Sequence, residues 1–202
     1  MYKVDGLEVK GKEISDLLAI NWLTPSMHNI ITGPESLRRN FFDRMVCSFY
    51  PLHKKRINKL EKLGKERLRL IEKKIRDESW FSVLEKEIAE LSIAIIVARK
   101  NFGTRLDQLM SNPNNSFFPP VRVLWKGMVE DLLIEKPAID VEENLANYLK
   151  IKRQEGVYSL FGPSTSILKI WFTNSGLTSE FCSTGQQKSI LVSQSSFQCL
   201  RN

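Results

Sequence analysis

The feature that most constrains the fold is a long apolar seam in the middle of the chain. Its members follow one another at intervals of 4, 3, 4, 3, 4, 4 and 3 residues: Leu84, Ile88, Leu91, Ile95, Ala98, Phe102, Leu106 and Leu109. This spacing brings all of them to one face of an α-helix, as in coiled-coil-like packing. The seam therefore predicts one long helix that packs along its length.

A second helical segment precedes the seam. Residues 52–76 are strongly basic, and they contain apolar residues at helical spacing: Ile57, Leu60, Leu63, Leu70, Ile71 and Ile75. A polar turn, Asp77-Glu78-Ser79, separates the two segments. Because two amphipathic helices joined by a short turn fold back on each other, the sequence predicts an antiparallel helical hairpin.

Strand and helix patterns flank the hairpin on both sides. Asp5-Gly6 predicts a tight turn between strands at 2–4 and 7–10. Further strands are predicted at 19–23, 121–125, 158–161 and 167–172, helices from 34 to about 49 and from 140 to about 153, and a loop at 111–120. The fold class is therefore α/β, a mixed head that carries a helical arm.

The positive charge of the chain is concentrated in one segment. The 202 residues have a formal net charge of +7, yet residues 38–76 hold 14 Lys plus Arg against 4 Asp plus Glu. This concentration predicts a polyanionic partner, with DNA-binding candidates at Arg38, Arg39, Lys54, Lys55, Arg56, Lys59 and Lys62. The alternative is a structural hairpin whose lysines form a solvated face.

The remaining composition narrows the class of protein. No apolar run reaches the roughly 18 residues of a membrane span, and no secretory signal is recognisable at the first residues, so we expect a cytoplasmic protein without a membrane partner. Three widely spaced cysteines predict reduced thiols. The two histidines are isolated in sequence, and no catalytic or metal-ligand cluster stands out.

Two stretches could bind phosphate. Gly6 to Lys12 matches G-x-x-x-x-G-K but has Glu13 at the Mg²⁺ position and a strand-like interior, so the hairpin explains it better. The second stretch, Phe181 to Lys188, places small and polar residues before a predicted helix. Such a stretch either offers N–H groups to a phosphate or simply caps the helix.

Two blocks together resemble a known family. Trp22-Leu23-Thr24-Pro25, Thr32-Gly33-Pro34 and Arg38 to Arg44 resemble the RecF family of DNA replication and repair proteins, and Ser183 to Lys188 resembles its ABC-type signature motif. The resemblance implies a partial ABC-ATPase-like head with an inserted antiparallel helical arm. It divides the chain into head strands (1–33), the arm (34–115) and a return to the head (116–202).

The resemblance also implies a function. Proteins of this family bind ATP and Mg²⁺, dimerise around the nucleotide, bind DNA at gaps and single-strand/double-strand junctions, and support recombinase loading with RecR and the SOS response. Signature residues contact the nucleotide of the partner protomer. By resemblance, the Ser183 hydroxyl would contact the γ-phosphate and Gly185 would let the backbone approach, while the rest of the motif would line the site: Thr184, Gln186, Gln187 and Lys188.

The chain departs from the family in its catalytic motifs. The family's phosphate loop would lie upstream of the first residue, and no apolar run ends in Asp-Glu as Walker B requires. Gly162-Pro163 matches a family block, but Ser164 and Thr165 replace its His and Arg. We therefore expect an internal fragment that does not hydrolyse ATP alone. The alternative function is a non-enzymatic, basic helical module for DNA binding or scaffolding.

Overall fold

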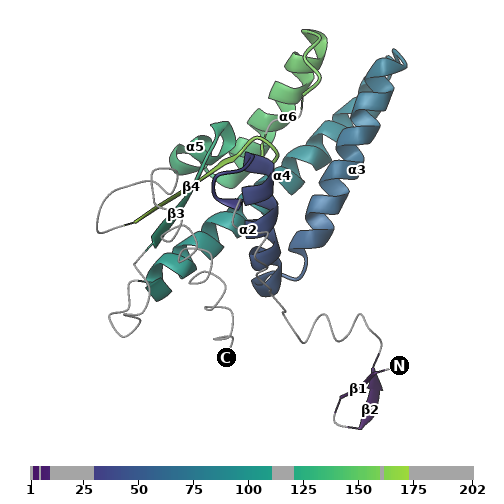
Figure 1. Cartoon of the computed structure of the whole chain (residues 1–202). Helices are drawn as coiled ribbons and strands as arrows, with labels where there is room; N and C mark the ends of the chain where they lie inside the picture. The colour runs from purple at the N-terminus through teal and green to yellow at the C-terminus, as the bar shows by residue number, and fades with distance from the viewer. Residues whose placement is uncertain (1, 5, 10–29, 111–120, 160–161, 173–202) are drawn as a thin grey trace.

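The computed structural model describes residues 2–4, 6–9, 30–110, 121–159 and 162–172 (Figure 1). Its elements, in chain order, are β1 (Tyr2–Val4), β2 (Leu7–Val9), α2 (Glu35–Phe49), α3 (His53–Glu72), α4 (Glu78–Met110), β3 (Val121–Lys126), α5 (Met128–Glu135), α6 (Ala138–Gln154) and β4 (Ile167–Phe172). The predicted strand at 19–23, the loop at 111–120 and the signature motif lie outside the described residues.

The predicted helical hairpin is confirmed. α3 and α4 are joined by a short connection and lie against each other (Figure 1). α4 spans 33 residues, about 50 Å of helix at 1.5 Å per residue. Its seam is buried at six positions and half-buried at Leu91 and Leu109: Leu84, Ile88, Ile95, Ala98, Phe102 and Leu106 are the buried ones.

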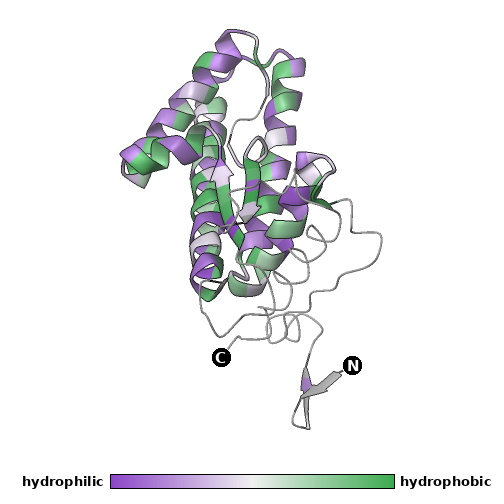
Figure 2. Ribbon diagram, turned by 60° about the vertical axis from the view of Figure 1, so that its left-hand side comes forward, coloured by the Kyte–Doolittle hydropathy of each residue, from purple (hydrophilic) through white to green (hydrophobic). Residues whose placement is uncertain are grey.

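Two apolar clusters form the core, and α4 belongs to both. Its C-terminal part packs with α2, β3 and β4, where Phe42 lies edge-on to Phe102 and Trp125. Its N-terminal part packs with α3, α5 and α6 around Ile88, Leu145 and Leu149. The helices are amphipathic, with green apolar residues and purple polar residues on different sides (Figure 2). The division of the chain into head strands (1–33), arm (34–115) and returning head (116–202) stays a prediction. α4 contributes residues to both clusters and so joins them.

The strands pair as two antiparallel ribbons. β3 pairs with β4 in a register that places Val121 opposite Phe172 and Lys126 opposite Ile167. Burial alternates strictly along β3, which confirms the pattern of Val121, Val123 and Trp125. The β1–β2 hairpin is also confirmed, and its turn residue Gly6 has φ +84°, a conformation that favours glycine.

Two expectations about local structure need correction, and one helix was not expected. The helix expected from Asp140 begins at Ala138, because Pro137 rather than an acidic box starts it. Of the strand expected at 158–161, Tyr158 and Ser159 are not in a strand, and residues 160 and 161 lie outside the described residues. The Tyr158 carbonyl accepts a hydrogen bond from Arg67 at 3.3 Å. The sequence patterns also missed α5, whose eight residues are too few to show a clear helical period.

Among the residues that the structure describes, no helix is long and apolar enough to cross a membrane. Within the same ranges no group of His, Cys, Asp or Glu could hold a metal ion, and Cys47 is a free thiol.

Candidate nucleic-acid interface

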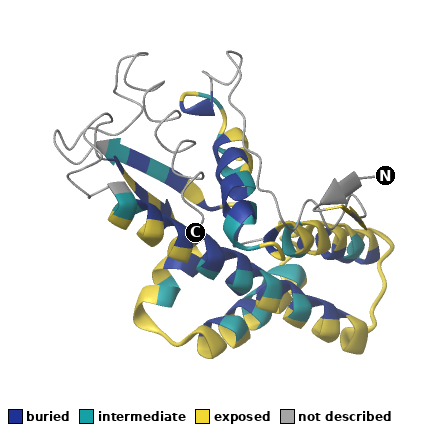
Figure 3. Cartoon of the chain, turned by 90° about the horizontal axis from the view of Figure 1, so that it is seen from below, coloured by how far each residue is buried: buried dark blue, intermediate teal, exposed yellow. Residues whose placement is uncertain are grey.

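α3 separates an apolar side from a basic side. Its buried residues recur every three or four positions, including Leu60, Leu63 and Leu70. The helix carries eight Lys or Arg against three Glu. The outward side of α3 consists of exposed residues, drawn in yellow in Figure 3. The exposed cations define what we call the α3 basic face: Lys54, Lys55, Lys59, Lys62, Lys65 and Arg69.

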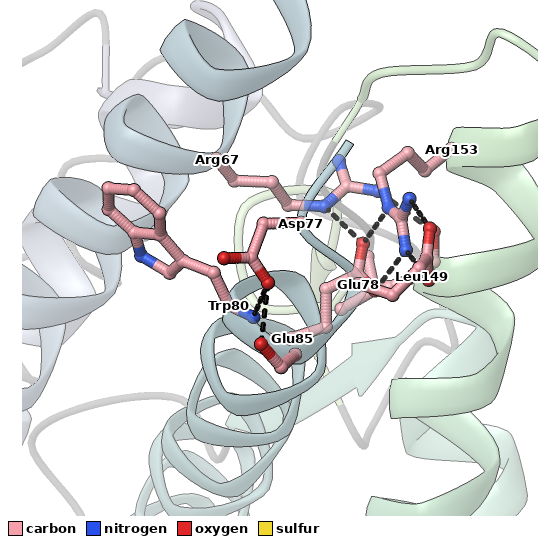
Figure 4. Close-up of polar contacts among 8 residues, drawn as sticks. Arg67, Asp77, Glu78, Trp80, Glu85, Leu149 and Arg153 are labelled. Carbon is pink, nitrogen blue, oxygen red and sulfur yellow. Dashed lines mark hydrogen bonds and ion pairs between the residues drawn. The ribbon is translucent and has the colours of Figure 1, made fainter. Parts of the chain in front are cut away.

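A buried arginine fixes α3 against the two neighbouring helices. Arg67 is 1% exposed, and its Nε donates to Glu85 Oε1 of α4 at 2.9 Å. Its Nη2 donates to the Leu149 carbonyl of α6 at 2.8 Å. Through these bonds one guanidinium joins α3, α4 and α6 (Figure 4). Since charge-assisted bonds are short and directional, they set the orientation of α3 and hence the direction of its basic face.

Arg153 completes this network from α6. Its Nε lies 3.1 Å from Glu85 Oε1, and its two Nη atoms donate to the Glu78 carboxylate at 2.9 and 3.1 Å. Its guanidinium also stacks over Phe81, 4.0 Å from the ring centre. The hydrogen bonds that Arg153 donates to Glu78, and then those to Glu85, raise the pKa of Arg153 despite partial burial. We call Arg67, Glu85, Arg153 and Glu78 the arm clamp.

The structure places the predicted DNA contacts in two environments. Lys54, Lys55, Lys59 and Lys62 are exposed on α3, and Arg56 is half-buried beside them. Lys59 also forms an ion pair with Glu87 of α4.

Arg38 is buried and Arg39 is half-buried, and both donate hydrogen bonds to other parts of the protein. Arg38 is 7% exposed and bonds to Glu35 and to the Ile31 carbonyl. Arg39 Nη1 donates to the Ser166 carbonyl at 3.0 Å. Burial, followed by repulsion from Arg99, lowers the pKa of Arg39. The candidate nucleic-acid interface therefore consists of α3 residues alone.

Sequence reasoning left two cations out of this interface. Lys65 and Arg69 lie exposed on α3, beyond the last predicted contact at Lys62. The intervals from 62 to 65 and from 65 to 69 are three and four residues, so helical spacing could have found them. With both included, the basic face runs nearly the full length of α3.

A second buried network lies at the base of the arm. Arg99 of α4 donates to both carboxylate oxygens of Asp43 in α2, at 2.8 and 2.7 Å. His53 Nε2 lies 2.9 Å from the same carboxylate. Burial raises the pKa of Asp43, but hydrogen bonds from Arg99 and His53 outweigh burial and hold that pKa below its usual value. The pair is therefore charged, with Arg99 stacked 4.4 Å over Trp125.

This network also holds the Gly162-Pro163 block. Arg99 Nη1 donates to the Pro163 carbonyl at 2.8 Å. Gly162 has φ +108°, a backbone conformation that residues with a side chain rarely adopt, and it lies beside Ser92. The residue type at Gly162 is thus required by the backbone conformation. The resemblance noted at this block has a structural basis even though Ser164 and Thr165 follow it.

Glu130 is a buried carboxyl beside the same turn. The Ser166 hydroxyl donates to its Oε1, while its Oε2 is buried without a hydrogen-bond partner. Burial raises the pKa of Glu130, and the bond from Ser166 only partly opposes this. A carboxyl with a raised pKa binds its proton more tightly in the folded state than in the unfolded state, so ionising it destabilises the fold.

We expect Glu130→Gln to alter how stability depends on pH. The free energy of unfolding of the natural chain should fall as pH rises from about 4.3, the pKa of an unfolded glutamate, through the raised pKa of Glu130 in the folded state. In the variant this contribution is absent. Urea unfolding at several pH values measures it: the natural chain should lose stability relative to the variant as pH rises. A constant difference between the two would contradict the burial argument.

One groove in the described part of the chain is a poor site for a nucleotide. A groove of about 530 Å³ lies between α4 and α6, and its charged lining has more carboxylates than amines: Glu85, Glu90, Glu142, Glu143, Lys86 and Lys150. Carboxylates repel phosphates, so this groove does not favour ATP. The predicted nucleotide contacts at 183–188 lie outside the described residues.

Comparison with solved structures defines the class of protein. The fold matches the recombination mediator protein RecF–ATPrS in the RecFOR pathway with a TM-score of 0.72 and 19% identity, over 87% of this chain and 49% of that one. RecF–ATP in the same pathway matches with a TM-score of 0.68 and 20% identity. The structure is thus a partial α/β, ABC-ATPase-like fold.

Sequence comparison identifies the family. RecF, the DNA replication and repair protein of Agrobacterium fabrum, is 34% identical over 195 residues, which are 94% of this chain and 52% of that protein. RecF of Rickettsia akari is 31% identical over 192 residues, 92% of this chain. The chain belongs to the RecF family, and it spans about half the length of the curated relatives it matches. No family model matches it.

Proposed function

We propose that this chain is a RecF-type DNA replication and repair protein in which the α3 basic face contacts DNA phosphates. The observation that carries the proposal is the one-sided row of exposed cations from Lys54 to Arg69, on a helix whose orientation the arm clamp fixes. Lys and Arg held on a rigid scaffold neutralise phosphates irrespective of base sequence. Family membership supports the same function.

The nucleotide part of the proposal rests on relatives. Two similar solved structures are RecF complexes named for ATP or ATPrS. We propose that residues 183–188 complete the ATP and Mg²⁺ site of a partner protomer, and that this chain alone does not hydrolyse ATP. RecR, recombinase loading at gaps and junctions, the SOS response and a cytoplasmic location belong to the same proposal and are supported by the family alone.

Salt dependence tests the DNA contact. If the exposed cations of α3 bind about five phosphates, log Kd for duplex DNA should rise with log salt at a slope of about 4.5, since each contact on B-DNA contributes about 0.9. Fluorescence anisotropy with a labelled duplex between 50 and 200 mM salt measures the slope. A slope near zero would mean that the lysines form only a solvated face.

A non-enzymatic DNA-binding or scaffolding module remains the second candidate, because the clamped arm is complete within the described residues. Nucleotide dependence separates the two functions. A RecF-type role predicts that ATP, but not ADP, draws the chain onto a full-length RecF protein in size-exclusion chromatography. Association that ignores the nucleotide would favour the module.

A further inference from the structure

The turn between α3 and α4 combines an exposed aromatic ring with exposed cations. We define the hairpin tip as residues 73–80. Trp80 is 47% exposed, and Lys73, Lys74 and Arg76 are exposed beside it in sequence. An indole that is half in solvent at the end of an arm contributes little to the core and leaves about half of its surface accessible to a ligand.

Lys74 has a backbone conformation that favours glycine. Its φ is +55°, and among the described residues it is the one non-glycine residue with positive φ. Its N–H donates to the Ile71 carbonyl at 2.9 Å, and the Ile75 N–H donates to the Leu70 carbonyl at 3.1 Å. These two bonds form a Schellman motif, whose left-handed position is usually glycine. Glycine would adopt this conformation with less strain than lysine does.

Trp80 is fixed at the start of α4. The Asp77 carboxylate accepts hydrogen bonds from the Trp80 backbone N–H, at 3.0 Å, and from the Ser79 hydroxyl. In Figure 4 the indole points away from the arm clamp. The backbone of Trp80 is therefore held in a capped first turn, and its side chain is about half exposed.

The acidic groups of the tip are mostly engaged locally. Asp77 caps α4, which lowers its pKa through bonds from Ser79 and the Trp80 backbone. Glu78 is held by Arg153, whose hydrogen bonds lower the Glu78 pKa. Glu72 remains exposed among Arg69, Lys73, Lys74 and Arg76. The balance of charge at the tip is thus positive and suits a polyanion.

We propose that the hairpin tip binds single-stranded DNA, with an unpaired base stacked on Trp80 and phosphates held by Lys73, Lys74 and Arg76. Stacked aromatic rings flanked by cations are the usual means of binding unpaired nucleotides. A duplex does not offer a free base face to the ring, so the tip discriminates strandedness. This inference rests on the proposed function that α3 contacts DNA, and it assigns a distinct ligand to the end of the same arm.

Trp80→Ala tests the stacking. Anisotropy with a labelled 12-nucleotide oligothymidine should show an affinity loss of roughly 5- to 150-fold, the range for one stacked base. Affinity for a 20-base-pair duplex should stay within about 2-fold, and Trp80→Phe should retain most oligothymidine binding. Unchanged oligothymidine affinity, or an equal loss for both probes, would overturn the proposal.

Lys74→Gly is expected to change stability and DNA binding in opposite directions. Relief of the left-handed conformation should raise the thermal unfolding midpoint, while loss of the ammonium should weaken oligothymidine binding. Higher stability with unchanged binding would show that Lys74 has no ligand. Glutamate substitutions on the α3 basic face separate the two proposals. If duplex binding survives these substitutions, the proposed α3 interface is wrong. The proposal for the hairpin tip is tested by the Trp80 variants alone.

Discussion

Changing Lys54, Lys55, Arg56, Lys59 and Lys62 together to glutamate is expected to weaken duplex DNA binding at least about 100-fold at low salt. Each lost phosphate contact removes its share of counterion release, and each new carboxylate repels the DNA. Four of these side chains are exposed on α3 and Arg56 is half-buried, so the buried apolar side of the helix is left unchanged. Anisotropy measures the affinity, and circular dichroism verifies the helix content.

A matched control changes the net charge equally at other exposed sites. Lys86, Lys100, Arg122, Lys136 and Lys150 are exposed and lie outside α3. Their replacement by glutamate should weaken binding far less, since only the general field of the protein changes. Equal losses in both variants would show that net charge, rather than the α3 basic face, attracts DNA.

Asp43→Ala is expected to destabilise the protein by about 3 to 5 kcal/mol, the usual result of removing one partner from a buried ion pair. Arg99 is 3% exposed and would lose the carboxylate that receives two of its N–H groups. His53, which is fully buried, would lose its partner as well. Urea unfolding measures the loss.

The control for this prediction removes both charges. Asp43→Ala combined with Arg99→Met should be more stable than Asp43→Ala alone, because no buried cation then remains without a partner. Asp140→Ala, at an exposed carboxylate of α6, should change stability little. If the double variant loses the sum of the two single effects, the ion pair does not act as a unit.

Periodic features of the fold could be predicted, since they depend on neighbours in sequence. The seam from Leu84 to Leu109 predicted α4, and the alternation of Val121, Val123 and Trp125 predicted β3 with its buried face. Gly6 predicted the hairpin turn for the same reason, because its backbone freedom is local.

The polar networks could not be predicted in the same way. Arg67 meets Glu85 and the Leu149 carbonyl, which are distant in sequence. One signal was available: Arg67 follows Leu63 by four residues and precedes Leu70 by three, so it lies on the apolar side of its helix. A cation at such a position needs a buried partner, but the identity of that partner depends on tertiary contacts.

The continuity of α4 has a mechanical consequence. The helix runs without proline from the hairpin tip to the sheet, and a helix of this length resists bending because each turn is closed by backbone hydrogen bonds. Because this one helix contributes side chains to both apolar clusters, a break introduced between Trp80 and Arg99 would loosen the two clusters together. The Gly162-Pro163 turn would be affected as well, since Arg99 of the same helix holds the Pro163 carbonyl.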